Sequence, residues 1–257
     1  MSSAAMFTAV TGSTAQQARI DVIANNLANL GTVGFRRMRA QFEDLLYESV
    51  QQPVAEGGSP TGLHFGRGTR LVATEQIHVG GTLRTTDQPL DIAIEGDGFL
   101  SVRKLNGDVA YTRNGSLRLD SNGALVSASG LPIDPPITLP SDTTGITIGS
   151  DGRVRVTQPG STSPTEVGQI QLYRFTNPAG LVPLGHNLLG ETDSSGSPVV
   201  GVPGEDAFGL IAQGMLEESN VSIAEELVNL ILAQRAFEAN TRVISTADDM
   251  LKFVTQR

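Results

Sequence analysis

The sequence of 257 residues has no cysteine and no tryptophan. Without cysteine there is no disulfide framework, thiolate metal site or cysteine nucleophile, and the chain suits an oxidising compartment. Its only lysines, Lys104 and Lys252, do not follow glycine, so it has no P-loop, and it has no GxSxG motif. The three histidines lie at no spacing that suits one metal ion. We therefore expect no enzyme and no catalytic, metal or cofactor-binding site.

Basic residues and long apolar runs are also scarce. Lys plus Arg number 18 against 27 Asp plus Glu, and the net charge of −9 argues against a nucleic-acid partner. Apolar runs such as Leu230–Ala233 are far shorter than the roughly 20 residues that span a bilayer. The first 18 residues have no basic side chain and no continuous apolar core, which predicts no secretory signal peptide.

Glycine and proline are nearly absent from both ends of the chain. Residues 1–30 contain only Gly12, and residues 215–257 contain neither type, although the chain has 29 Gly and 13 Pro. Because these residues end helices and mark turns between short strands, the sequence predicts an α+β fold. Long terminal helices would pair in a coiled-coil-like domain, with a β-rich middle domain inserted between them. The expected parts are an N-terminal helix at 1–30, an extended segment at 31–68, the β domain at 69–214 and a C-terminal helix at 215–257.

The first predicted helix runs from about Ser3 to Leu30, before the natural stop Gly31. Its stripe follows a three- and four-residue spacing, apolar at the ends and polar in the middle. The members are Met6, Ala9, Ser13, Gln16, Ile20, Ile23, Leu27 and Leu30.

The second predicted helix has an apolar residue at every seventh position, with Asn220 or Ser222 as its N-cap. The heptad residues are Ile223, Leu230, Phe237, Ile244 and Leu251. We expect this stripe to pack on another long helix, in the same chain or in a neighbour. The alternative is an amphipathic helix folded onto its own domain.

The middle of the chain has three Asn-Gly pairs eight residues apart, at residues 106, 114 and 122. Asn-Gly favours type I′ hairpin turns, so the pairs predict strands of about six residues between them. A further hairpin is expected over Ile146–Val156, with more strands in Leu90–Val102 and Val167–Phe175. Gln51–Gly68 is rich in glycine, proline and serine, and predicts an extended loop.

Charged residues cluster at a few positions. Adjacent carboxylate pairs occur at Glu205-Asp206, Glu217-Glu218, Glu225-Glu226 and Asp248-Asp249, among other positions, and we interpret these as solvated because neighbours on a helix diverge by about 100°. The basic group Arg36, Arg37 and Arg39 is either a solubilising patch or a partner for an acidic surface on a neighbouring subunit.

Asparagines crowd the end of the first predicted helix, although Asn is a poor helix former. They either form hydrogen bonds to another helix and fix its register, or make an exposed polar face. With their neighbours they resemble the N-terminal signature of bacterial flagellar rod and hook proteins. The matching residues include Ile20, Ile23, Asn25, Asn26, Leu27, Asn29, Gly34 and Phe35.

Two further stretches resemble the same family of axial proteins. One is Asp91–Phe99 followed by Tyr111–Ser116, which is similar to the family's β-domain motif. The other is similar to its C-terminal signature and spans Glu218–Asn240. The assembly residues that the resemblance and the heptads give the C-terminal helix are Asn220, Ile223, Leu227, Leu230, Gln234, Arg235, Phe237, Ile244 and Leu251.

The segment after the first helix resembles the distal-rod members of the family, in which it is associated with a straight, rigid rod. Its residues are Phe42, Glu43, Asp44, Leu45, Leu46, Tyr47 and Pro53. The resemblance implies a structural subunit that polymerises through its terminal helices into a hollow drive shaft, which carries torque to the hook and passes exported subunits. A hook or proximal rod protein, or a secreted β-domain binding module oligomerised by its helices, remains the alternative.

The resemblance also implies a location and a set of partners. The rod would cross the periplasm as part of the basal body, after export by the flagellar type III apparatus without a cleaved signal. Its partners would be further copies of the chain, the proximal rod proteins, the hook protein, and the outer-membrane and peptidoglycan ring proteins. No nucleic acid and no direct membrane span are expected.

Overall fold

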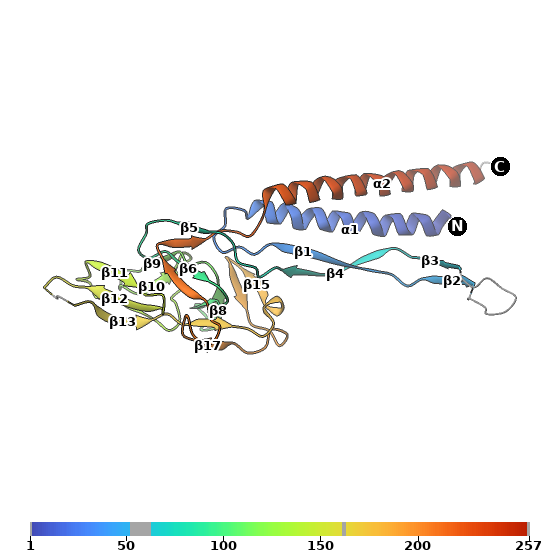
Figure 1. The fold of residues 1–257 in the computed structure, drawn as a ribbon. Coiled ribbons are helices and arrows are strands. Elements are labelled where there is room, and N and C mark those ends of the chain that lie inside the picture. The colour runs from blue at the N-terminus through green and yellow to red at the C-terminus, as the bar shows by residue number, and fades with distance from the viewer. Residues whose placement is uncertain (1, 52–62, 161–162, 256–257) are drawn as a thin grey trace. The chain divides into compact units, whose positions relative to one another are not determined.

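The computed structural model describes residues 2–51, 63–160 and 163–255, which form two compact units (Figure 1). The helix unit comprises Met1–Ala28, Met38–Gln76 and Ser222–Arg257. The β unit comprises Asn29–Arg37 and Ile77–Val221. The chain therefore passes between the units four times.

The helix unit is built on two antiparallel helices, α1 (Ser2–Ala28) and α2 (Ile223–Thr255). The start of α1 and the end of α2 lie at the same end of the pair (Figure 1). The predicted α+β class, with contacts between the terminal helices, is confirmed. The C-terminal helix begins later than residue 215, because Met215–Glu217 form strand β19 of the β unit.

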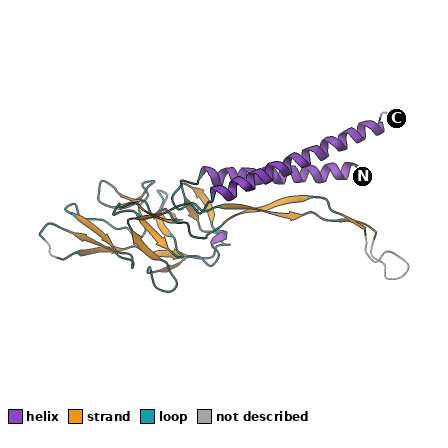
Figure 2. Cartoon of the chain, turned by 45° about the horizontal axis from the view of Figure 1, so that its top comes forward, coloured by secondary structure: helices purple, strands orange, loops and turns teal. Residues whose placement is uncertain are grey.

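A long β-hairpin completes the helix unit and packs along α1 (Figures 1 and 2). Strand β1 (Met38–Asp44) pairs antiparallel with β4 (Thr69–Gln76), and β2 (Glu48–Gln51) pairs with β3 (Leu63–Phe65). The prediction of an extended loop over Gln51–Gly68 is thus wrong at Gln51 and Leu63–Phe65, which lie in strands; residues 52–62 lie outside the described residues. Most side chains of this ribbon are exposed, so its sequence lacks the alternation of apolar and polar residues that predicts a half-buried strand.

The β unit consists of short antiparallel pairs and small sheets. A four-stranded sheet has the order β15-β16-β8-β7, a three-stranded sheet the order β11-β12-β13, and the remaining pairs are β5–β19, β6–β18, β9–β10 and β14–β17. The strands not yet bounded are β5 (Leu83–Thr85), β6 (Ile92–Glu95), β7 (Leu100–Arg103), β8 (Val109–Thr112), β9 (Leu117–Leu119), β10 (Leu125–Ser127), β11 (Gly145–Ile148), β12 (Arg153–Thr157), β13 (Thr165–Gln169), β14 (Leu172–Arg174), β15 (Val182–Gly185), β16 (Leu188–Gly190), β17 (Val199–Gly201) and β18 (Leu210–Gln213). A short 3₁₀ helix spans Pro178–Gly180.

Two of the three Asn-Gly pairs lie in hairpin turns as predicted. Gly107 and Gly123 have positive φ angles and lie between β7 and β8 and between β9 and β10. The predicted hairpin at Ile146–Val156 is also confirmed, with Ile146 opposite Val156 in β11 and β12. The prediction is wrong at Asn114-Gly115, since β8 pairs with β7 and β16 and not with β9.

The core of the β unit explains why these short strands hold together. Eighteen buried residues form one apolar cluster, in which Ile92, Leu172 and Val154 are fully enclosed. Along β12, Val154 and Val156 point inward while the three intervening and flanking side chains are exposed. This period of two places one face of each small sheet in the core.

A glycine that lets two backbones approach closely gives the first prediction. The Ile92 N–H donates to the Gly115 carbonyl at 3.0 Å, and a Cβ at Gly115 would lie 1.7 Å from the Ile92 oxygen. Gly115→Ala should therefore lower the free energy of unfolding of the β unit by about 2 kcal/mol or more, measured by urea unfolding. Gly31→Ala is the control, because a Cβ there meets nothing within 4 Å. Equal stability of the two variants would contradict the close approach.

Candidate functional site

The helix unit has a small apolar interior. Its buried apolar residues, among those that the structure describes, are Ala9, Ala15, Ile23, Ala233 and Ala247. One large side chain and four alanines bury far less apolar surface than the cluster inside the β unit. The helix unit therefore depends on polar contacts for its internal register.

The main polar contact of the helix unit is made by Asn26, which is 1% exposed. Its side-chain oxygen accepts from the Met38 N–H at 2.8 Å, and its Nδ2 donates to the Met38 carbonyl at 2.9 Å. The same Nδ2 donates to Oε1 of the buried Glu226 at 3.3 Å, and Arg19 Nη2 donates to Asn229 Oδ1 at 3.1 Å. These bonds tie α1 to both α2 and β1.

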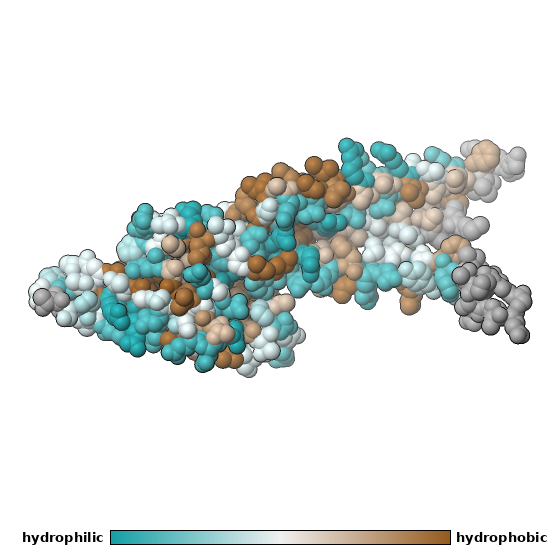
Figure 3. All heavy atoms as spheres, viewed as in Figure 1, coloured by the Kyte–Doolittle hydropathy of each residue, from teal (hydrophilic) through white to brown (hydrophobic). Residues whose placement is uncertain are grey.

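Large apolar side chains of the helix unit lie on its outside. On α2, five of them occupy adjoining rows of one face, at spacings of one, three and four residues. They are Ile223, Leu227, Val228, Ile231 and Leu232, and between 45% and 57% of each is exposed. Figure 3 shows apolar side chains gathered over the first half of α2. We call these five residues the α2 stripe.

The hairpin of the helix unit also exposes apolar residues. Phe42, Tyr47 and Phe65 are exposed, and Leu46 is 90% exposed. An isolated two-stranded ribbon is marginal in water, and this one packs against α1.

The residues that the sequence singled out differ in their exposure to solvent. Ile23, Asn26 and Gly34 are buried, and Pro53 lies outside the described residues. The half-buried residues are Ile20, Leu27, Asn29, Phe35, Leu45, Asn220, Leu230, Phe237 and Ile244. The exposed residues are Asn25, Phe42, Glu43, Asp44, Leu46, Tyr47, Ile223, Leu227, Gln234, Arg235 and Leu251. Within one chain, the predicted heptad stripe is thus covered only in its middle.

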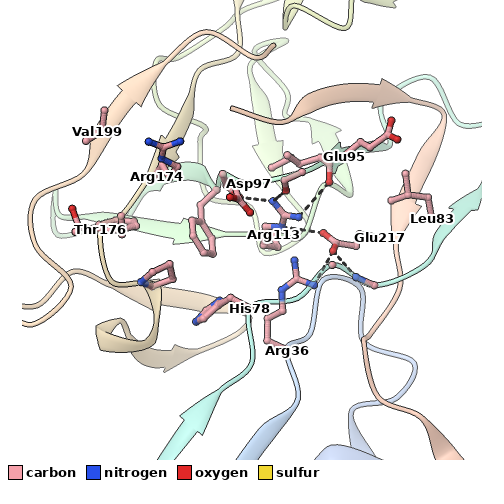
Figure 4. Close-up of a pocket in the computed structure, with 18 residues that line it drawn as sticks. Arg36, His78, Leu83, Glu95, Asp97, Arg113, Arg174, Thr176, Val199 and Glu217 are labelled. Carbon is pink, nitrogen blue, oxygen red and sulfur yellow. Dashed lines mark hydrogen bonds and ion pairs between the residues drawn. The ribbon is translucent and has the colours of Figure 1, made fainter. Parts of the chain in front are cut away.

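The β unit contains a cleft of about 630 Å³ around a buried charge cluster (Figure 4). Glu217 is 1% exposed, and its carboxylate lies between two buried arginines. Its Oε1 is 2.7 Å from Arg36 Nη1, and its Oε2 is 3.0 Å from Arg113 Nε. His78 lines the same cleft and packs edge-on against the Phe99 ring.

Opposing effects set the ionisation of Glu217. Burial raises the pKa of its carboxyl, but Arg113, Arg36 and the Gly81 N–H together outweigh burial and hold this pKa below its usual range. Burial likewise lowers the pKa of Arg113, against the attraction of Glu217. The cluster therefore contains one carboxylate and two guanidinium groups, all charged at neutral pH.

Two predictions about charged residues are wrong. Arg36 is neither a solubilising patch nor free for a neighbouring subunit, because it is buried against Glu217 of its own chain. Glu217 and Glu226 are not solvated, whereas Glu218 forms an exposed ion pair with Arg84. Nothing in the local sequence separates Glu217 from Glu218, so only the fold distinguishes them.

Within the described residues, no group of three or more potential ligands could hold a metal ion. No helix in the same residues is both long and apolar enough to cross a membrane.

Three family models match the chain. They are the flagella basal body rod protein model (residues 6–36), the flagellar hook protein FlgE/F/G D1 domain (residues 93–156) and the flagellar basal body rod FlgEFG protein C-terminal model (residues 212–257). These matches, with paired terminal helices around a β-rich middle, define a structural protein of the flagellar rod and hook class.

Full-length relatives narrow this class. The flagellar basal-body rod protein FlgG of Buchnera aphidicola subsp. Acyrthosiphon pisum is 48% identical over 96% of this chain and 96% of its own length. FlgG of Caulobacter vibrioides is 43% identical over 98% of both chains. The hook-basal body complex protein FlhP of Bacillus subtilis is 28% identical over 97% of both. The chain belongs to the family of flagellar basal-body rod proteins; it is a structural subunit and not an enzyme.

The buried hydrogen bonds of Asn26 give a second prediction. Asn26→Ala should lower the free energy of unfolding of the helix unit by about 1–3 kcal/mol, because it leaves the Met38 backbone groups and Glu226 without this partner. Urea unfolding of the full chain, with amide exchange along α1 to locate the change, measures the loss. Gln17→Ala, which removes only an exposed bond to Asp21, should cost less than about 0.5 kcal/mol. Similar losses in both variants would show that Asn26 has no special role.

Proposed function

We propose that the chain is a distal-rod subunit that polymerises with copies of itself through the helix unit. The polymer is a rigid hollow shaft that carries motor torque to the hook and passes exported subunits. The observation that carries this proposal is the α2 stripe, which exposes five large apolar side chains on a unit with a small apolar interior.

Burial of the α2 stripe supplies the driving force for assembly. Fully burying one Leu, Ile or Val side chain contributes roughly 1.5–3 kcal/mol. A contiguous exposed apolar patch on a soluble chain marks an interaction site. When one surface of a subunit binds a different surface of the next without closing a ring, a helical filament results. We assign this contact to α1 and α2 of neighbouring copies, packed as a coiled-coil-like layer.

The hairpin supplies the second contact and the stiffness of the rod. It holds the distal-rod type segment Phe42–Tyr47, whose apolar residues are exposed although α1 supports the ribbon. A neighbouring copy that covers Leu46 and Tyr47 would hold the ribbon at both sides. Torque would then pass through two contacts per subunit, which resists bending better than one.

The remaining partners follow from the family. The relatives are named as basal-body rod proteins, and one as a hook-basal body complex protein. We propose that the ends of the polymer meet the proximal rod proteins and the hook protein, and that ring proteins of the outer membrane and peptidoglycan surround it in the periplasm. Export through the flagellar type III apparatus would bring the subunit there. Full-length similarity to FlgG does not favour a hook protein or a secreted binding module.

A charge placed in the α2 stripe tests assembly. Ile231→Asp should abolish rods in electron micrographs of isolated basal bodies and stop swimming, because an unpaired carboxylate would be buried in the contact between copies. The β unit should keep its thermal unfolding midpoint. Ser245→Asp, which places the same group at another exposed position of α2, should leave rods and swimming intact. Normal rods with Ile231→Asp would disprove the role of the stripe.

A matched pair of exposed leucines tests the hairpin. Leu46→Asp should give rods that are shorter or that bend, since Leu46 is 90% exposed and gains cover only from a neighbouring copy. Leu105→Asp makes the same change in a turn of the β unit, where the leucine is 98% exposed, and should leave the rods straight. Rod length and curvature by electron microscopy measure both. Straight rods of normal length with Leu46→Asp would refute a contact at the hairpin.

A further inference from the structure

Three segments of the β unit carry the four chain crossings: residues 29–37, the segment that begins at Ile77 and the segment that ends at Val221. We call them the first, second and third crossing segments, and hydrogen bonds within the β unit join them. The Ile77 N–H donates to the Arg37 carbonyl at 2.9 Å, which joins two of the crossing segments. The Gly34 N–H donates to the Glu217 carbonyl at 2.8 Å, which joins the first crossing segment to β19. The three segments that carry the four crossings are therefore linked to one another.

Asn220 connects the same segments through its side chain. Its Oδ1 accepts from the Arg37 N–H at 2.7 Å, and its Nδ2 donates to the carbonyls of Ile77 and Val79, both at 2.9 Å. The side chain of Asn220, which precedes the last crossing, thus contacts the segment that ends at Arg37 and the segment that begins at Ile77.

The Glu217 carboxylate links these segments to the body of the β unit. Its Oε1 accepts from the Gly81 N–H at 2.9 Å and pairs with Arg36, which lies in the first crossing segment. Its Oε2 pairs with Arg113, whose Nη1 donates to the Gly96 and Gly98 carbonyls. Figure 4 shows the three charged side chains converging at this point.

Two glycines allow the backbones to come this close. A Cβ at Gly34, where φ is +69°, would lie 2.7 Å from the Arg113 carbonyl carbon. A Cβ at Gly81 would lie 1.9 Å from the backbone carbonyl oxygen of Glu218. The segments are therefore packed backbone to backbone around Glu217.

We propose that the charge of Glu217 holds the crossing segments together and ties them to the body of the β unit. We call the residues that make these contacts the crossing clasp: Gly34, Arg36, Ile77, Gly81, Arg113, Glu217 and Asn220. Loss of the Glu217 negative charge releases the chain crossings of the β unit together, while the apolar core stays folded. Any load that passes from one unit of a rod subunit to the other along the covalent chain travels through these crossings, and the clasp would hold their ends in the β unit.

The charge balance explains why the crossings would release together. With Glu217 neutral, the guanidinium groups of Arg36 and Arg113 would remain buried without a carboxylate between them, and removing one partner from a buried ion pair is strongly destabilising. The other charged or titratable residues of the cleft are Glu95, Asp97, Arg174 and His78. Asp97 attracts Arg113 but is exposed, so water screens it.

Amide hydrogen exchange on the full-length monomeric chain tests the clasp. In Glu217→Gln, the N–H groups of Gly34, Ile77 and Gly81 should exchange roughly 100-fold faster or more, because a buried ion pair has lost one partner. The N–H groups of Ile92 and Phe99, which are bonded within the β unit, should keep their rates. Glu218→Gln makes the same change at the exposed neighbour and should alter none of them.

Each outcome decides the proposal. Unchanged exchange in Glu217→Gln would overturn it, and so would equal acceleration at Ile92 and Phe99, which would make Glu217 an ordinary part of the core. If Glu217→Gln does not fold, Asn220→Ala replaces it and should accelerate exchange at Ile77 and Arg37 without changing Ile92. Slow exchange at Ile77 in that variant would disprove the clasp.

Acid provides an independent readout on the unmodified chain. Because the folded chain lowers the pKa of Glu217, its contribution is complete above the unfolded value of about 4.5 and is lost as the pH falls below it. Protection at Gly81, corrected for intrinsic exchange, should therefore fall as the pH is lowered below about 4.5, and this fall should be absent in Glu217→Gln. An identical pH profile in both chains would contradict the proposal. These measurements use the monomer, so they stand or fall separately from polymerisation.

Discussion

The crossing segments of the β unit meet at one carboxylate that two buried arginines share. Glu217 holds Arg36 and Arg113 at 2.7 and 3.0 Å, and none of the three charges could remain buried without the others. Their closeness requires glycine at 34 and 81, because a Cβ at either position would meet backbone atoms. The ion cluster, the two glycines and the meeting of the crossing segments therefore depend on one another.

The helix unit differs from the β unit, because it has a small apolar interior and exposes many large apolar side chains. Its buried residues are Ile23, four alanines and polar residues such as Asn26, while most of its large apolar side chains, such as Ile231, are exposed or half-buried. Small residues let α1 and α2 approach closely. Hydrogen bonds between polar side chains fix the register of the two helices without burying much apolar surface. Such a unit leaves apolar surface that other chains could cover, as we propose for this member of the flagellar rod family.

The sequence predicted features that depend on local pattern. Nearby residues determine three features that were predicted and found: helices at the two chain ends, which are nearly free of glycine and proline, the turns at Gly107 and Gly123, and the alternation along Val154 and Val156. The hairpin β1–β4 was missed, because its strands are exposed on most positions and carry no alternating signal. Asn114-Gly115 has the composition of a turn but serves a close backbone approach.

The sequence by itself determined the fold class, the two terminal helices and the family, because composition, periodicity and motifs are local properties of the chain. Only the tertiary structure decided which of two adjacent glutamates is buried, and that Arg36 pairs within its own chain. Burial of a charge is set by residues distant in sequence: Glu217 meets partners at 36 and 113. No local pattern can encode such a meeting, since it exists only once the segments have come together.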